Sequence, residues 1–129
     1  MFRLISYQTI LLSALALVLI GCGKDNPSRH LELGKWYNAK GLYDEAITEY
    51  REVIRLSSPP SLQKLSREEY ENLTTAHYNL ALMYTKKGWW DFALDAAESS
   101  FQLQPNTDTH ELIRLIREQI MLNNNTEPS

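Results

Sequence analysis

The sequence predicts an all-α protein that contains two consecutive helical hairpins and a C-terminal capping helix. The chain resembles itself after a shift of 47 residues, and each copy holds a glycine between two short segments with helical spacing. A third segment with the same spacing of apolar residues follows Pro105. Together these features predict a repeat architecture, in which each hairpin buries its apolar face against the next one.

The two copies share identical residues at positions that matter for helix packing. The shift of 47 residues pairs His30 with His77, Leu33 with Leu80, Tyr37 with Tyr84, Lys40 with Lys87, Gly41 with Gly88, Asp44 with Asp91, Ala46 with Ala93 and Leu56 with Leu103. Gly41 and Gly88 are expected to end the first helix of each hairpin in a left-handed conformation. Small residues at Gly34 and Ala81 are expected to let the two helices approach closely.

The spacing inside each copy resembles the tetratricopeptide repeat (TPR). The residues that carry the resemblance are Leu33-Gly34, Tyr37, Ala46 and Tyr50 in the first copy, and Leu80-Ala81, Tyr84, Ala93 and Pro105 in the second. With a period of about 34 residues, the resemblance implies repeats over 27–60 and 74–107. Both copies depart from the family by carrying His where Trp is commonest, and Ala97 replaces a large aromatic residue.

Residues 61–73 exceed the repeat period and are read as an insert. The stretch Ser57-Ser58-Pro59-Pro60-Ser61 predicts a turn or rigid loop, since Pro-Pro cannot continue a helix. Ser66 and Glu69 then match a capping box. The apolar stripe from Tyr70 to Tyr84 predicts one helix over about 67–87, extended by about two turns. A separate short helix with a break near Thr74-Thr75 is the alternative.

Residues 108–122 resemble the helix that caps a repeat array. Asp108 and Glu111 are predicted as its cap pair. The apolar residues of this segment outnumber those of a single amphipathic stripe, so the helix is either deeply packed or carries a contact surface. Residues 123–129 are polar and are predicted to be disordered.

The first 21 residues have the build of a signal peptide, with Arg3 near the start and an apolar stretch over about 10–20. The end of this segment, Leu19-Ile20-Gly21-Cys22, resembles the lipobox of bacterial lipoproteins. That resemblance implies cleavage before Cys22, a diacylglycerol thioether on its thiol, and acylation of the new amine, for example with palmitate. Residues 22–26 then form a short tether. An uncleaved transmembrane helix, which needs about 20 apolar residues, and a buried core helix are the alternatives.

Composition favours one small, acidic domain. Removal of residues 1–21 from the 129-residue chain leaves 108 residues, with 12 basic and 16 acidic side chains and a net charge of about −4. This balance argues against a nucleic-acid binder. Since Cys22 is the single cysteine, no internal disulfide is expected.

The residues after the lipidated cysteine suggest the location. Asp at this place commonly retains a Gram-negative lipoprotein in the inner membrane, whereas this chain has Gly23-Lys24. An outer-membrane protein facing the periplasm is therefore expected. In a Gram-positive cell the same sequence would lie on the outer face of the plasma membrane.

The sequence offers no arrangement typical of an enzyme. His30, His77 and His110 are dispersed, and neither a phosphate-binding glycine loop nor a zinc-binding cysteine pair is present. The matching places of His30 and His77 indicate a shared packing role, with a metal held between them as the alternative. We expect a non-enzyme with no cofactor beyond the covalent lipid.

The TPR resemblance implies a partner-binding groove lined by the first helix of each repeat. Its residues here are Leu31, Lys35, Asn38, Tyr78, Leu82 and Thr85. Trp89, in the second turn, is a further candidate, or else a side chain folded over the helix ends. Trp36 is expected to be buried, because its counterpart is Met83. A clamp for a C-terminal carboxylate is disfavoured, since Leu31 and Lys35 stand where that clamp has Lys and Asn.

The sequence therefore predicts a lipid-anchored adaptor or scaffold that binds a protein or peptide partner in the bacterial cell envelope, for example in an assembly or secretion machinery. An accessory or inhibitor of an envelope enzyme is one alternative. A structural lipoprotein that forms homo-oligomers through the C-terminal helix is the other.

Overall fold

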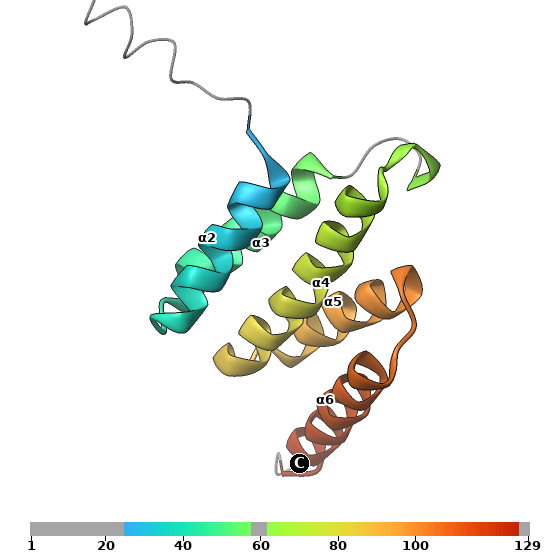
Figure 1. Cartoon of the computed structure of the whole chain (residues 1–129). Helices are drawn as coiled ribbons and strands as arrows, with labels where there is room; N and C mark the ends of the chain where they lie inside the picture. Colours follow the sequence, from blue (N-terminus) through green and yellow to red (C-terminus); the bar gives the residue numbers. More distant parts are fainter. Residues whose placement is uncertain (1–24, 58–61, 127–129) are drawn as a thin grey trace, which may run out of the picture.

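The computed structural model describes residues 25–57 and 62–126. These ranges form five α-helices and no strand, which confirms the all-α prediction for this part of the chain. The helices are α2 (Pro27–Ala39), α3 (Tyr43–Leu56), α4 (Arg67–Lys87), α5 (Trp90–Leu103) and α6 (Thr107–Thr126), with a short 3-10 helix η1 (Leu62–Lys64) before α4. Each α-helix packs on the next, and α4 also packs on α2 (Figure 1).

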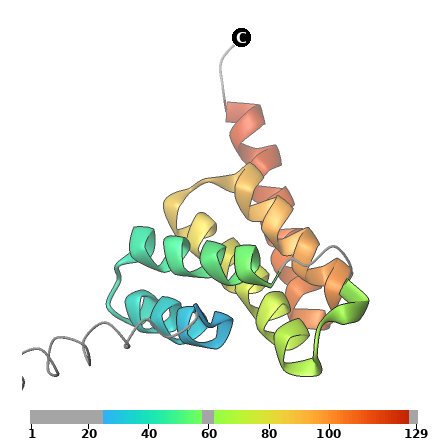
Figure 2. The same cartoon turned by 90° about the horizontal axis from the view of Figure 1, so that it is seen from above.

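Two tight turns fold the chain into the hairpins α2–α3 and α4–α5. Gly41 and Gly88 lie in these turns with φ angles of 74° and 72°, as the sequence predicts. A residue with a Cβ atom would be strained in this left-handed region. Because successive helices run in opposite directions, both turns lie at the same end of the molecule as the C-terminus of α6 (Figures 1 and 2).

The two hairpins are packed through different pairs of side chains at one equivalent place. In the first hairpin Gly34 faces the fully buried Tyr50, and a Cβ atom at Gly34 would lie 2.5 Å from Tyr50 Cε1. The equivalent residues of the second hairpin, Ala81 and Ala97, are both completely buried. A large ring over a glycine in one hairpin is therefore replaced by two methyl groups in the other.

The core is continuous through all five helices. Its buried apolar residues are Leu31, Ala46, Ile47, Tyr50, Val53, Ala76, Leu80, Ala81, Met83, Ala93, Ala96, Ala97, Ile113 and Ile116. Six of these fourteen positions are alanines, so the second hairpin is held by close helix contact and few large side chains.

Helix α4 is one continuous helix of 21 residues, with the bounds that the apolar stripe predicts. Ser66 Oγ accepts a hydrogen bond from the Glu69 N–H (3.2 Å), and Glu69 Oε2 accepts one from the Ser66 N–H (2.8 Å). The capping box is thus present. At the alternative break, the Thr74 hydroxyl instead donates to the Tyr70 carbonyl within the helix. Residues 58–61, most of the predicted loop, lie outside the described residues.

The N-terminal extension of α4 connects two other helices. Asn72 Nδ2 donates to Ser28 Oγ (2.9 Å), and the Ser28 hydroxyl donates to Glu68 Oε1 (3.1 Å), so the extension is bonded to the first turn of α2. The Tyr70 hydroxyl donates to the Leu103 carbonyl at the end of α5. The inserted residues therefore join the start of the first hairpin to the end of the second.

Helix α6 differs from its prediction at both ends. It is capped by Asn106, whose Oδ1 accepts from the Thr109 N–H (2.8 Å), so the predicted cap at Asp108 is wrong. The helix continues to Thr126, so residues 123–126 are helical and their predicted disorder is wrong. A bond from Gln119 Nε2 to Asn123 Oδ1 (3.0 Å) supports this continuation. Residues 127–129 lie outside the described residues.

The predicted signal peptide, Cys22 and most of the tether also lie outside the described residues, which begin at Asp25. None of the helices in the described part of the chain combines the length and apolar character that a membrane span requires.

Candidate functional site

The predicted groove residues of α2 are not all available to a partner. Leu31 is only 5% exposed and belongs to the core, so its assignment to a binding surface is wrong. Helix α2 packs on both α3 and α4, and Ser28, one turn before Leu31, is bonded to Asn72 of the α4 extension. Lys35 is exposed and forms an ion pair with Glu32 (2.9 Å), while Asn38 is half-buried.

The predicted residues of α4 remain partly accessible. Tyr78, Leu82 and Thr85 are half-buried, and the Thr85 hydroxyl donates to the Ala81 carbonyl of its own helix. Tyr78 lines a small recess of about 220 Å³ together with the loop before α6, at Gln104 and Asn106. The structure thus brings Tyr78 to the start of α6, and the sequence prediction did not include this neighbour.

A groove of about 810 Å³ lies between α5 and α6. We call it the α5–α6 groove. Phe101, Ile113 and Met121 contribute its apolar surface. Its remaining lining residues are polar or charged: Glu98, Gln102, His110, Arg114, Arg117 and Glu118.

Ion pairs organise the rim of the α5–α6 groove. Arg117 Nη2 lies 2.6 Å from Glu98 Oε1 and connects α6 to α5. Arg114 pairs with Glu111 (2.7 Å) and Glu118 (3.2 Å) on its own helix. The hydrogen bond from Arg114 lowers the pKa of Glu111 and raises the pKa of Arg114, so both groups stay charged at neutral pH. The rim therefore presents both signs of charge around an apolar floor.

The α5–α6 groove occupies the same place in the stack as a smaller hollow one helix pair earlier. That hollow, of about 300 Å³, is lined on α3 by Arg51, Ile54 and Arg55 and on α4 by His77, Leu80 and Tyr84. The residues at the equivalent positions of the next helix pair line the α5–α6 groove. They are Glu98, Phe101 and Gln102 on α5 and His110, Ile113 and Arg117 on α6. Helix α5 closes the earlier hollow with Phe92 and Ala96. No helix of the described residues closes the later one.

Arg114 distinguishes α6 from the first helices of the two hairpins. It occupies the position in its unit that Ala81 occupies in α4 and Gly34 in α2. In α2 and α4 the small residue allows close contact with the next helix, whereas Arg114 is exposed. A helix therefore cannot pack on α6 as closely as α5 packs on α4.

The second hairpin turn carries an exposed aromatic cluster. The rings of Tyr84, Trp89 and Phe92 lie with centroids 5.7–6.4 Å apart, and Lys87 Nζ lies 5.2 Å from the Trp89 centroid. Trp89 is 45% exposed and Phe92 63%. Trp90 instead packs against the core. Trp89 is thus an available surface residue.

Trp36 is 53% exposed, so its predicted burial is wrong. Its counterpart Met83 is almost completely buried because α4 packs on α3 before it and α5 after it. Within the described residues α2 has no helix before it in the stack. The Trp36 ring contacts Tyr37, with Lys40 Nζ 5.8 Å from the ring centroid.

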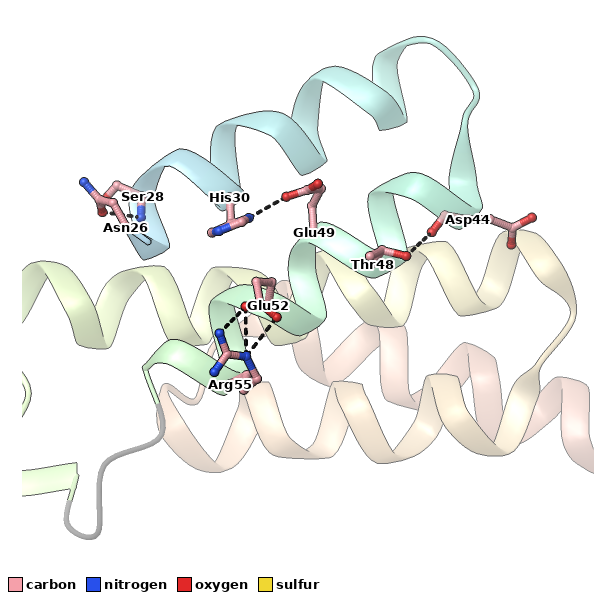
Figure 3. Close-up of polar contacts among 8 residues, drawn as sticks. All are labelled: Asn26, Ser28, His30, Asp44, Thr48, Glu49, Glu52 and Arg55. Atoms are coloured by element: carbon pink, nitrogen blue, oxygen red, sulfur yellow. Dashed lines mark hydrogen bonds and ion pairs between the residues drawn. The ribbon is translucent and has the colours of Figure 1, made fainter. Parts of the chain in front are cut away.

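The equivalent histidines His30 and His77 have different surroundings. Figure 3 shows His30 pointing from α2 toward Glu49 of α3, with Nδ1 2.6 Å from Oε2. The counterpart of Glu49 in the second copy is Ala96, so His77 has no such partner. Burial lowers the pKa of His77, and Asp95 opposes this shift only in part. The shared position therefore does not produce a shared interaction.

The other polar contacts in Figure 3 lie within single helices or their caps, among them a bond from the Thr48 hydroxyl to the Asp44 carbonyl (3.0 Å). Asn26 Oδ1 accepts from the Ser28 N–H (2.9 Å) and caps α2, and Arg55 pairs with Glu52 on α3. Nowhere in residues 25–57 and 62–126 do three His, Cys, Asp or Glu side chains form a group that could hold a metal ion.

No protein-family model matches the chain, and comparisons with curated proteins and with solved structures give no significant match.

Proposed function

We propose that this chain is a lipid-anchored adaptor of the bacterial cell envelope, whose TPR-like helical stack binds a partner protein. The observation that carries the proposal is the α5–α6 groove, which combines an apolar floor with a charged rim. Ligand sites of proteins are commonly concave and apolar, with a few polar groups that fix orientation.

The TPR-like interpretation is supported by equivalent residues in three successive units. Gly41 and Gly88 have the same left-handed conformation in the two turns. Three residues of α6 are buried: Thr109, Ile113 and Ile116. Each lies at the same sequence separation from a buried residue of α4, namely Ala76, Leu80 and Met83. This interval, from position 76 to position 109, is close to the family period of about 34 residues. Helix α6 therefore takes the place of the first helix of a third repeat.

The groove favours a peptide segment with one large apolar anchor. Phe101 and Met121 supply apolar contact from two helices, and the Arg117–Glu98 pair can donate to and accept from a peptide backbone. Since Arg114 keeps a neighbouring helix at a distance, an extended segment or a single helical turn fits better than a closely packed helix.

The proposed anchor holds the stack close to the bilayer. Helix α2 begins at Pro27, so four residues separate Cys22 from the start of the domain. This tether reaches about 15 Å at full extension. Two or three acyl chains on Cys22 would make membrane attachment stable, whereas one chain is marginal.

Partner binding can be tested with a photo-cross-linking amino acid at position 121 of the full chain in its membranes. We expect one recurrent protein partner, whose cross-linked yield falls about tenfold or more with Arg117→Glu, which reverses a rim charge and breaks the pair with Glu98. The control is Leu62→Glu, an exposed site on η1. Loss of yield in both variants, or no cross-linked protein at all, would contradict the proposal.

The anchor is tested separately by Cys22→Ser. We expect this variant to accumulate in the soluble fraction or as an uncleaved precursor of higher mass, because a hydroxyl cannot form the thioether. A variant that stays in membranes at the mature mass would exclude lipidation at Cys22.

A further inference from the structure

Most exposed large apolar side chains of the described residues lie at one end of the molecule. Eight such side chains are exposed, and six of them lie around the two hairpin turns and the C-terminal turns of α6. Five of these six, which we call the apolar end, are Trp36, Leu42, Trp89, Phe92 and Leu122, while the sixth, Met121, lines the α5–α6 groove. We infer that this chain pairs with a second copy of itself through the apolar end.

The apolar end is built by the repeat. Trp89 is the counterpart of Leu42 in the second copy, and Leu122 follows Trp89 at the interval that separates Leu80 from Ile113. Leu42 and Trp89 thus occupy the same place just after the two hairpin turns, and Leu122 lies in the C-terminal part of α6, which continues to Thr126. Because α2, α4 and α6 run in the same direction, the two turns and the end of α6 fall at one end of the molecule (Figures 1 and 2). An ion pair between the Lys87 and Asp44 side chains, at 2.9 Å, connects the two hairpin turns directly.

The apolar end is large enough for a dimer contact. Each of its five side chains is about half exposed, which amounts to about 500 Å² if a large side chain offers about 200 Å². Patches of this size on a monomer commonly mark interaction surfaces. Two copies would bury about 1,000 Å², and the surrounding polar residues bring the total near the lower limit of stable interfaces, about 1,200 Å².

The charges around the apolar end favour a second copy over a partner of one charge sign. Lys40 and Lys86 are exposed there, as are Glu45 and Asp91 in the first turns of α3 and α5. Within the described residues none of these four forms an ion pair. A strongly acidic or basic partner would meet two like charges. A two-fold contact between identical surfaces can set the lysines of one copy against the acids of the other.

The pairing is compatible with the proposed anchor and does not depend on it. The N-terminus of α2 lies about 20 Å from the first turn, the length of its 13 residues. Two copies joined at their apolar ends therefore carry their N-termini at the outer ends. Both tethers can then reach one bilayer with the two-fold axis along its normal.

The first test places a photo-cross-linking amino acid at position 89 of the full chain, co-expressed with two different epitope tags. We expect a cross-linked species of twice the chain mass that carries both tags. The matched control has the cross-linker at Arg67, whose side chain is 92% exposed at the opposite end of α4. Equal dimer yield from position 67, or products with only other proteins or lipid at position 89, would overturn the inference.

The second test changes the charge of side chains at and around the apolar end and measures the effect on the dimer yield. Leu42→Glu should reduce the dimer yield about tenfold or more, since it buries a carboxylate in the apolar contact. Leu62→Glu, on η1, should not, and equal helicity by circular dichroism would show that both variants fold. One copy with Lys40→Glu and Lys86→Glu should cross-link to a copy with Glu45→Lys and Asp91→Lys better than either does to itself. If this mixed pair shows no preference, the two-fold contact is excluded.

Discussion

Gly34 and Tyr50 fill a volume that the second hairpin divides between Ala81 and Ala97. We expect Gly34→Ala to lower the free energy of unfolding by about 1–3 kcal/mol, because its Cβ overlaps the Tyr50 ring. Tyr50→Ala should cost about 3–5 kcal/mol by leaving a cavity. The double variant reproduces the Ala–Ala pair and should cost clearly less than the sum. Urea unfolding of the four proteins measures this coupling, and additive costs would show that the two sites are independent.

The Tyr50 hydroxyl is buried and has no hydrogen-bond partner among the described residues. Tyr50→Phe should therefore raise the free energy of unfolding by about 1 kcal/mol. Burial, with the nearby Glu32, raises the pKa of Tyr50 to about 12, so the wild type should lose stability as the pH rises above 10. Tyr50→Phe should lose less over the same range. As a control, Tyr70→Phe removes a hydroxyl that is bonded to Leu103 and should destabilise the protein.

His77 makes stability depend on pH on the acidic side. Burial lowers its pKa below 6.5, so the unfolded chain binds a proton more readily than the folded one. The contribution of the neutral His77 side chain to stability should be fully present above about pH 6.5. It should be lost progressively as the pH falls from 6.5 to the pKa of His77 in the folded protein. Chemical unfolding at a series of pH values checks this, and His77→Gln should flatten that part of the profile. An equally steep decrease in His77→Gln would assign the effect to other groups.

At the scale of helices, the start of α4 depends on its capping box. Ser66→Ala removes the acceptor for the Glu69 N–H and should lower the free energy of unfolding by about 1 kcal/mol. Thermal unfolding followed by circular dichroism measures the change. Ser99→Ala is a suitable control, because the Ser99 hydroxyl only donates to the Asp95 carbonyl inside α5. Its loss should be neutral or slightly stabilising, and an equal cost in both variants would argue against a specific cap effect.

Helix ends were predictable where the chain carries explicit signals. Ser66 with Glu69 marks the start of α4, and Gly88 marks its end, so both bounds followed from the sequence. The C-terminus of α6 carries no glycine that would mark the end of the helix, as Gly88 does for α4. The polar composition of residues 123–129 suggested disorder, but the helix continues to Thr126 with local contacts such as Gln119 with Asn123.

At the scale of the whole molecule, stability should be highest in the middle of the stack. Helix α4 packs on α2, α3 and α5, whereas α6 packs mainly on α5. In a stack where each unit contacts only its neighbours, terminal units open first. We expect the slowest amide hydrogen exchange in α4 and the fastest helical exchange in the last turns of α6. Uniform protection across the five helices would indicate a single cooperative unit.

Surface residues were harder to predict than helices, because their exposure depends on neighbours far away in the chain. Leu31 was expected at the surface and is buried in the core, while Trp36 was expected inside and has no helix of the described residues to cover it. The α5–α6 groove was indicated only by the surplus of apolar residues in 108–122. Its position required knowledge of how α6 crosses α5.

Arg114 has a consequence for how this architecture could be lengthened. A further hairpin grafted onto α6 would need a small residue at this position before its second helix could approach, as Gly34 and Ala81 permit in the earlier units. A small residue at position 114 is therefore one requirement for lengthening the stack at α6, and a substitution of Arg114 would be a first step in such a design.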